Sequence, residues 1–253
     1  MINNKSVFTI IIAREGSKGI PNKNVRQLLG KPLVEWSILA ALKSKYTDYV
    51  FVSSDCLKVK NSYYNILKSF YTTSSKEIKD NLYWIQRPRE YATDKTTNEE
   101  TLLHAMEHIQ KEMNLKSDII VHLQPTSPCR YGDLIDKCLE KYIEGKYDSL
   151  LTALKTTPFI WQKIDGEWKY TVDRNNCCNR KRRQDFEEHE MIWHDCGNVY
   201  ITDYDVLMAD KCRIGKKPCV YETDKIQSIQ IDEEDDFLLI EKLCETKEMK
   251  SLI

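Results

Sequence analysis

The stretch "IIIAREGSKGIPNKN", residues 10–24, joins an apolar run to a loop that is rich in glycine and positive charge. Arg14, Lys18 and Lys23 fall within ten residues, with two glycines between them. Glycine lets backbone N–H groups approach an anion, so a strand that ends in such a loop before a helix is typical of phosphate binding. The spacing matches neither GxxxxGK[ST] nor GxGxxG, and a solvated turn is the alternative. Three cations directly after the first strand favour the phosphate site.

The rest of the N-terminal half alternates between two patterns. Short apolar runs read as strands, and amphipathic stretches with apolar residues at helical spacing lie between them. Thr96 to Glu99 carries a capping-box pattern. This alternation predicts an α/β fold with a mostly parallel sheet that is covered on both faces. The predicted strands are 7–13, 49–54, 82–86, 118–123 and 149–154, and the predicted helices are 31–44, 57–70, 97–113 and 131–145.

The pattern breaks after residue 155. Asp165-Gly166 lies between two alternating segments, which is a strong hairpin signal, and a charged stretch with few core-forming residues follows. We therefore predict an α/β core from residues 1–155 and 194–253, with an arm at 156–193. The arm has too few apolar residues for a core of its own, so we expect it to pack against a second copy in a homodimer.

The parallel pattern is expected to resume after the arm. Residues 197–202 and 226–231 read as strands, and residues 233–245 as a final helix.

Composition excludes several classes of protein. The chain has 253 residues and a net charge of −1, which argues against a nucleic-acid partner bound through bulk charge. No apolar run is long enough to span a bilayer, and we expect no signal peptide. Nine cysteines without a CxxC pair then indicate reduced thiols and a cytoplasmic location. A zinc site at Cys177-Cys178 with His189 and His194 is disfavoured, because the spacing matches no common zinc pattern.

Two more polar loops follow predicted strands. They are "QRPREYATD", residues 86–94, and "LQPTSPCR", residues 123–130. Loops at the carboxyl ends of strands line the ligand crevice of an open α/β sheet. We therefore expect one crevice that receives these two loops together with the loop that follows the first strand.

These three loops together resemble the acylneuraminate cytidylyltransferase family. "RRQD" (182–185), "CGNVYI" (196–201) and "SIQID" (228–232) follow in the family's order, so the resemblance covers nearly the whole chain. It implies a Rossmann-like nucleotidyltransferase fold with a protruding dimerisation element. It also implies a Mg²⁺-dependent reaction in which the anomeric hydroxyl of a nine-carbon 2-keto acid sugar attacks the α-phosphate of CTP, and pyrophosphate leaves.

The resemblance also implies roles for individual residues. Phosphate chemistry depends on positioned cations and a metal ion, so the expected catalytic residues are Arg14, Lys23 and the metal ligand Asp232. The other expected positions are Ser17, Lys18, Asn24 and Arg87 for the nucleotide, and Gln124, Thr126, Ser127, Arg183 and Gln184 for the sugar. Arg183 and Gln184 would act from the arm, as contributions to a partner subunit, where an arginine suits the sugar carboxylate.

The metal site departs from the family pattern. The family has aspartate at two positions, where this chain has Gln230 and Asp232. In a strand these two residues would share one face. Mg²⁺ needs only one or two protein carboxylates when phosphates and water complete its shell. We therefore expect Asp232 to be the metal ligand, with the Gln230 carbonyl oxygen or a water in place of the second carboxylate.

The sugar side departs as well. The sialic acid enzymes have Asn-Gly-Ala where this chain has Cys196-Gly197-Asn198, and "WHDCGN" is nearer to relatives that activate pseudaminic or legionaminic acids. Three alternatives stay open: GTP with legionaminic acid, CTP with pseudaminic acid or a shorter keto-deoxy acid, and a nucleotide-binding relative with impaired catalysis.

Overall fold

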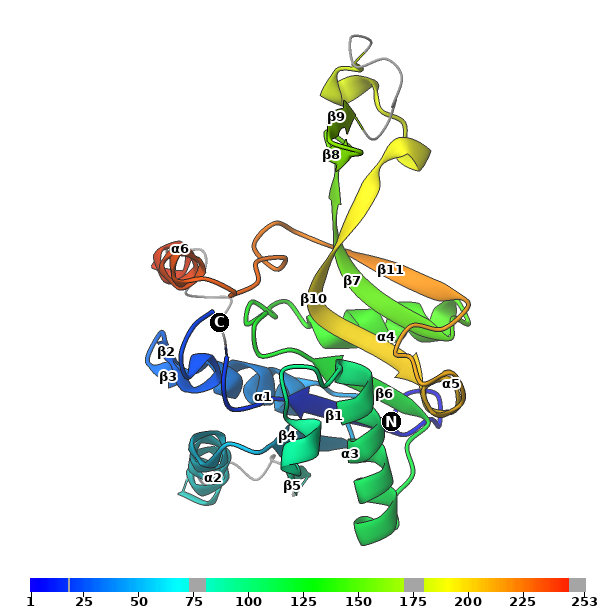
Figure 1. Cartoon of the computed structure of the whole chain (residues 1–253). Helices are drawn as coiled ribbons and strands as arrows, with labels where there is room; N and C mark the ends of the chain where they lie inside the picture. Colours follow the sequence, from blue (N-terminus) through cyan, green and yellow to red (C-terminus); the bar gives the residue numbers. More distant parts are fainter. Residues whose placement is uncertain (18, 73–80, 171–179, 246–253) are drawn as a thin grey trace.

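Seven strands of the described residues form one sheet, in the order β11-β7-β10-β6-β1-β4-β5. The computed structural model describes residues 1–17, 19–72, 81–170 and 180–245 (Figure 1). The strands are β1 (Val7–Ile12), β4 (Tyr49–Ser54), β5 (Leu82–Gln86), β6 (Ile119–Leu123), β7 (Ser149–Thr156), β10 (Ile192–Asp203) and β11 (Pro218–Thr223).

One strand of this sheet runs against the others. β1 is parallel to β4 and β6, β4 to β5, and β11 to β7, whereas β10 is antiparallel to both of its neighbours, β6 and β7. The mostly parallel sheet is confirmed. The prediction that the parallel pattern resumes at residues 197–202 is wrong, because the chain returns from the arm at the far end of the sheet and can only re-enter in the opposite direction.

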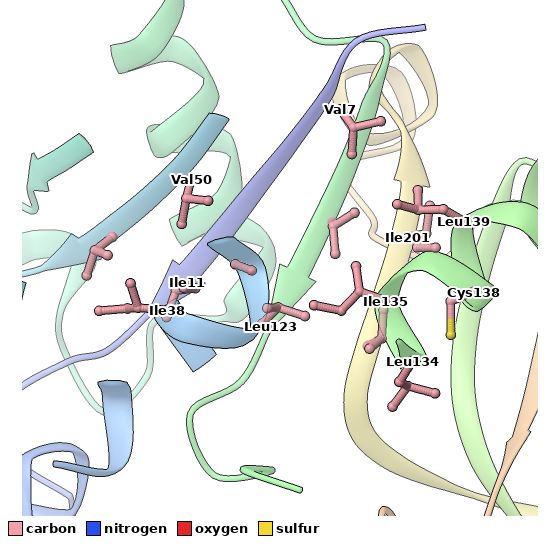
Figure 2. Close-up of a cluster of buried hydrophobic side chains, with 14 of the residues drawn as sticks. Val7, Ile11, Ile38, Val50, Leu123, Leu134, Ile135, Cys138, Leu139 and Ile201 are labelled. Carbon is pink, nitrogen blue, oxygen red and sulfur yellow. The ribbon is translucent and has the colours of Figure 1, made fainter. Parts of the chain in front are cut away.

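Helices cover both faces of the sheet (Figure 1). Successive side chains of β1 point to opposite faces: Val7 and Ile11 belong to one buried cluster, and Phe8 and Ile10 to another. The first cluster includes α1 (Leu33–Lys43), α2 (Leu57–Thr72) and α4 (Leu134–Glu144), and the second includes α3 (Asn98–Met113) and α5 (Tyr204–Asp210). In Figure 2, Leu134, Ile135 and Leu139 of α4 lie over β6 and β10.

A third buried cluster joins the two ends of the chain. Phe237 and Ile240 of α6 (Glu234–Cys244) pack with Ile20, Leu28 and Leu33 from the N-terminal part. Ile231 is fully buried in the same cluster. This packing brings the segment before α6 to the loop that follows β1. The short pair β2 (Gln27–Leu28) and β3 (Lys31–Pro32) lies in this region, at the start of α1.

The strand predicted at residues 226–231 is wrong. Residues 225–228 form a turn, and residues 229–232 carry no regular structure. The alternating isoleucines are nevertheless buried or half-buried: Ile231 lies in the third cluster and Ile229 packs against it. The alternation of isoleucines in this segment reflects burial of one side of the chain. That side packs against a helix and a loop and not against a neighbouring strand.

The predicted hairpin is confirmed. β8 (Trp161–Ile164) and β9 (Glu167–Tyr170) pair antiparallel, and the two residues between them, Asp165 and Gly166, both have positive φ. The hairpin stands away from the sheet at the end of an extension of β7 and β10 (Figure 1). The short helices η3 (Arg183–Asp185) and η4 (Glu188–Glu190) precede β10. Because β7 and β10 run across the expected boundaries at 155/156 and 193/194, that division of the chain stays a prediction.

Two elements carry no clear sequence signal. α5 has only seven residues, and β11 follows a polar, lysine-rich stretch. The capping box of α3 is present one residue later than predicted: Thr97 accepts from the N–H of Glu100, and the Glu100 side chain accepts from the N–H of Thr97.

Candidate active site

Three loops meet in one open pocket of about 350 Å³. They follow β1, β5 and β6, which are strands of the same direction and therefore end at the same edge of the sheet. The convergence expected from the sequence is thus observed. The pocket is lined by Ile12, Arg14, Ser17, Lys23, Asn24, Arg87, Tyr91, Thr93, Asp94, Thr96, Asn98, Thr101, Gln124, Pro125 and Thr126.

The loop after β1 is held by its own contacts. The Asn24 side-chain amide donates to the carbonyl of Arg14 at 2.9 Å, which ties the two ends of the loop together. Asn22 adopts a left-handed conformation just before the short helix η1 (Lys23–Val25). A Cβ on Gly19 would lie 2.6 Å from the carbonyl oxygen of Asp232, so only glycine allows this close approach. Lys18 lies outside the described residues.

Lys23 is held by two contacts with the segment before α6. Its ammonium donates to the carbonyl of Ile231 at 2.8 Å and to Oδ1 of Asp232 at 3.1 Å. The Lys23 side chain is 12% exposed, whereas that of Asp232 is 66% exposed. The third buried cluster holds Ile231 and therefore also the backbone carbonyl that orients Lys23.

Arg14 faces a carboxylate from another loop. Its Nη1 lies 2.6 Å from Oδ1 of Asp94, and both side chains line the pocket. The pair joins the loop after β1 to the loop after β5.

Arg87 is almost completely buried at the base of the pocket, with 3% of its surface exposed. Its Nη2 donates to the carbonyl of Ser53 at 2.7 Å and its Nη1 to that of Tyr91 at 3.5 Å, while Nε has no partner in the described structure. Burial lowers the pKa of Arg87 to about 10, with the Asp55 carboxylate opposing this shift and the Arg14 guanidinium adding to it. Arg87 therefore stays cationic at neutral pH and also shapes the turn at η2 (Arg89–Tyr91).

The loop after β6 contributes two of its three predicted residues to the pocket. Gln124 and Thr126 line it, whereas Ser127 is fully buried and donates to the carbonyl of Cys196 at 3.1 Å. Ser127 therefore joins this loop to β10 and does not face the pocket. Its expected contact with a sugar stays a prediction.

Sequence reasoning missed the role of Arg130. Its guanidinium donates to the carbonyls of Gln124 at 2.6 Å and Asn198 at 2.8 Å, and to Oγ of Ser37 at 2.8 Å. Burial lowers the pKa of Arg130 to about 9, so it remains a cation that is satisfied by carbonyl and hydroxyl oxygens. The only sequence signal was its place at the end of the third polar loop. The residue positions the backbone of Gln124.

Gln230 and Asp232 have different neighbours. A Cβ on Gly197 would lie 2.5 Å from Oε1 of Gln124 and 2.8 Å from Nε2 of Gln230, so both glutamines approach the backbone of Gly197, which has a positive φ of 61°. Asp232 instead contacts Lys23. Gln230 therefore lies on the Gln124 side of the site. The expectation that Gln230 and Asp232 share one face of a strand is wrong, because these residues do not form a strand.

No group of three or more His, Cys, Asp or Glu side chains in the described ranges is arranged to hold a metal ion. The available donors beside Lys23 are one exposed carboxylate, that of Asp232, and neutral amide or carbonyl oxygens. This set fits a Mg²⁺ ion that phosphate and water oxygens complete, and it does not fit a metal cage built by the protein alone. Cys177 and Cys178, considered for zinc, lie outside the described residues.

Arg183 and Gln184 lie away from this pocket. Both are exposed on η3 and line a second hollow at the base of the arm, with Lys155, Phe186, Glu188 and Lys225 among its other residues. Within one chain, the structure does not bring these two residues to the pocket that holds Arg14 and Lys23.

Within the part of the chain that is described, none of the helices has the length and apolar character needed to cross a bilayer.

Comparison with known proteins gives a consistent set of matches. A family model described as "Cytidylyltransferase" matches residues 8–86. An N-acylneuraminate cytidylyltransferase of Oncorhynchus mykiss is 28% identical over 240 residues, which is 94% of this chain and 50% of the relative. A CMP-N,N'-diacetyllegionaminic acid synthase of Legionella pneumophila is 28% identical over 252 residues, 94% of this chain and 96% of the relative. The chain spans about half the length of the first of these relatives.

Solved structures share the fold. A CMP:2-keto-3-deoxy-manno-octonic acid synthetase complexed with CTP superposes with a TM-score of 0.62 at 14% identity, over 94% of this chain and 98% of the other. A 4-diphosphocytidyl-2C-methyl-D-erythritol synthase of Anaerococcus prevotii gives a TM-score of 0.62 at 12% identity, over 96% and 99% of the two chains. At these identities the likeness concerns the fold alone.

Proposed function

We propose that the chain is a member of the acylneuraminate cytidylyltransferase family, and that it transfers CMP from CTP to the anomeric hydroxyl of a nonulosonic acid and releases pyrophosphate. The observation that carries this proposal is the convergence of three loops on one pocket, where Arg14, Lys23 and Arg87 line one ligand site. A pocket with three cations suits a triphosphate.

The chemistry assigns distinct tasks to the cations. Negative charge builds on the phosphate oxygens as the sugar hydroxyl attacks the α-phosphate, and fixed positive charge stabilises that state more than the ground state. Lys23 is fixed by the Ile231 carbonyl, so its ammonium needs little reorganisation to serve this role. Arg14 and Ser17 bind the phosphates, Asn24 holds the loop closed, and Arg87 lies beside the nucleoside.

A metal ion belongs to the proposal. Asp232 would hold Mg²⁺ together with the nucleotide phosphates, and the ion would supply charge neutralisation of the triphosphate. Gln230 lies against Gly197 and Gln124, so we assign its amide to the sugar side, and a water replaces the second carboxylate.

We propose that the sugar acceptor binds at the wall of the pocket formed by the loop after β6. Gln124 and Thr126 line this wall, and Gln230 lies beside Gln124 at Gly197; their neutral amide and hydroxyl groups suit the hydroxyls and acyl amides of a nonulosonic acid. The match to the CMP-N,N'-diacetyllegionaminic acid synthase covers 96% of that relative, and it favours a legionaminic-type acid as a second candidate acceptor beside sialic acid.

The arm is proposed to complete the site in a homodimer. Trp161 and Trp168 on the hairpin are 42% and 67% exposed among the described residues, and exposed apolar side chains of this size are typical of an interaction surface. In a two-fold dimer these faces would be buried against the second copy, and Arg183 and Gln184 would reach the acceptor of the other subunit. We also propose a cytoplasmic location, because reduced thiols are typical of that compartment.

A substrate panel tests the function. CTP, GTP, UTP and ATP are each combined with sialic, legionaminic, pseudaminic and shorter keto-deoxy acids, and pyrophosphate release is followed with and without Mg²⁺. The proposal expects turnover with CTP and at least one nine-carbon acid, dependent on Mg²⁺. Release with another nucleotide only, or none with any pair while CTP still binds, would refute it.

A further inference from the structure

The pocket proposed for the triphosphate contains one carboxylate among the described residues that line it. Its charged lining residues are the cations Arg14, Lys23 and Arg87 and the anion Asp94. A carboxylate in a phosphate pocket opposes its ligand, because like charges at short range disfavour each other. Its presence therefore calls for a physical explanation.

Asp94 lies directly on one of the cations. Its Oδ1 accepts from Nη1 of Arg14 at 2.6 Å, and the two side chains are 45% and 32% exposed. The two residues come from different loops, so the contact joins two walls of the pocket. Each loop has its own internal bonds: Asn24 holds the Arg14 carbonyl, and the hydroxyls of Thr93 and Thr96 lie 2.8 Å apart.

The contact is poorly suited to a purely structural role. An ion pair that is exposed on both sides contributes little stability. The backbone at Arg14 is already fixed by Asn24, and the loop that carries Asp94 is already fixed by Arg87, which donates to the Ser53 carbonyl at 2.7 Å. The pair does determine which group the Arg14 guanidinium contacts before a ligand binds.

We propose that Asp94 is an exchangeable counter-ion of Arg14 that sets the affinity of the pocket for phosphate groups. The inference rests on the proposed function, since it concerns the same pocket. A phosphate oxygen and the Asp94 carboxylate compete for one guanidinium, because both use the same donor fork. Triphosphate binding breaks the Arg14–Asp94 pair, and departure of pyrophosphate lets it form again. Asp94 thus weakens binding of both CTP and pyrophosphate and favours product release.

Ligand affinities with metal removed by EDTA test this directly. Calorimetric titration of D94N is expected to give about tenfold tighter binding of CTP and of inorganic pyrophosphate than wild type, since an ion pair and a repulsion are lost together. Cytidine has no phosphate, so its affinity, measured by saturation-transfer NMR, should not change. D94S removes the same charge and should behave like D94N, whereas D94E should remain close to wild type.

Glu140 provides a matched control. It also forms an ion pair at the surface, with Lys45 at 3.0 Å, and its side chain is 46% exposed, but it lies outside the pocket. E140Q removes the same unit of negative charge and should leave all three affinities unchanged.

The outcomes separate this inference from the proposed function. Wild-type protein that binds no CTP either in EDTA or with Mg²⁺ refutes the proposed function itself. Wild type that binds CTP, with D94N equal to it or weaker, overturns the counter-ion role. An equal gain for cytidine, or an equal gain in E140Q, also overturns it, because the effect would then not pass through phosphate at Arg14.

Discussion

The ammonium nitrogen of Lys23 lies 3.1 Å from Oδ1 of Asp232, although the two residues are 209 positions apart in the sequence. The contact joins the loop after β1 to the segment before α6, and Ile231 anchors it in a buried cluster. The principal cation of the proposed site and its proposed metal ligand are therefore positioned by one another.

Lys23→Ala should lower turnover strongly. The loss of a fixed charge beside the phosphates corresponds to about 2–4 kcal/mol of transition-state stabilisation, by analogy with lost oxyanion donors. Pyrophosphate release under saturating CTP measures this. The melting temperature should fall only slightly, because the losses are one hydrogen bond to the Ile231 carbonyl and one ion pair with the exposed Asp232 carboxylate. Activity close to wild type would show that the loop is a turn without a catalytic role.

Asp232→Asn should abolish activity at ordinary Mg²⁺ concentrations. Only neutral oxygens would then remain for a hard cation that prefers carboxylates. A Mg²⁺ titration of pyrophosphate release measures the effect. An unchanged Mg²⁺ requirement in this variant would place the metal elsewhere.

Gln230→Asp is the companion variant. Gln230 lies beside Gly197 and Gln124, so an added carboxylate there should raise the KM for the sugar more than it lowers the Mg²⁺ requirement. The opposite result, a lower Mg²⁺ requirement with an unchanged KM, would restore Gln230 to the metal side.

The exposed aromatic faces of the arm should be buried in a dimer. Light scattering at micromolar concentration is expected to give twice the chain mass of 29.8 kDa. Trp168→Glu should shift the species toward monomer, because a charge would replace a side chain that is 67% exposed in the single chain. A fully active monomer would remove both the dimer and the action of Arg183 on a partner subunit.

Arg130→Lys should destabilise the fold by about 2–3 kcal/mol, because lysine cannot make the several hydrogen bonds of the guanidinium to Gln124, Asn198 and Ser37. Urea denaturation measures the change. The control is Arg182→Lys, whose guanidinium pairs with Asp185 at the surface and whose loss should cost less than about 1 kcal/mol. Equal effects of the two substitutions would contradict the positioning role of Arg130.

His122 should make the protein less stable in mild acid. It is buried against Tyr200, neither ring nitrogen has a partner in the described structure, and burial lowers its pKa from 6.5 to about 3. The unfolded chain therefore binds a proton below pH 6.5 that the folded chain does not, so stability is full above that pH and falls as the pH drops toward 3.

The slope of this effect is about 1.4 kcal/mol per pH unit for one proton. His122→Phe keeps an aromatic ring but cannot titrate. The difference in unfolding free energy between the two proteins, measured from pH 7 to pH 4, should therefore change with pH in favour of the variant. Parallel curves would show that His122 does not carry this linkage.

Local patterns in the sequence were sufficient for the order of the longer strands and helices up to residue 156 and for the three polar loops at strand ends. The mostly apolar run in residues 7–12 indicates a strand that is buried on both faces, and helical spacing in residues 98–113 records which side of the helix is buried. The parallel strands then bring the loops to one edge, which predicted a single pocket lined by Arg14, Lys23, Arg87, Gln124 and Thr126.

Tertiary structure decided which distant segments of the chain contact one another. Ile229 and Ile231 alternate with polar residues as in a strand, but they are buried against a helix and a loop. No local sequence pattern distinguishes this kind of burial from that of a strand. The direction of β10, the burial of Ser127, the hydrogen bonds of Arg130 and the pairs Arg14–Asp94 and Lys23–Asp232 depend on how distant segments meet. Periodicity encodes whether a side chain is buried, whereas the identity of its contact is set by the order of strands in the sheet and the packing of α6.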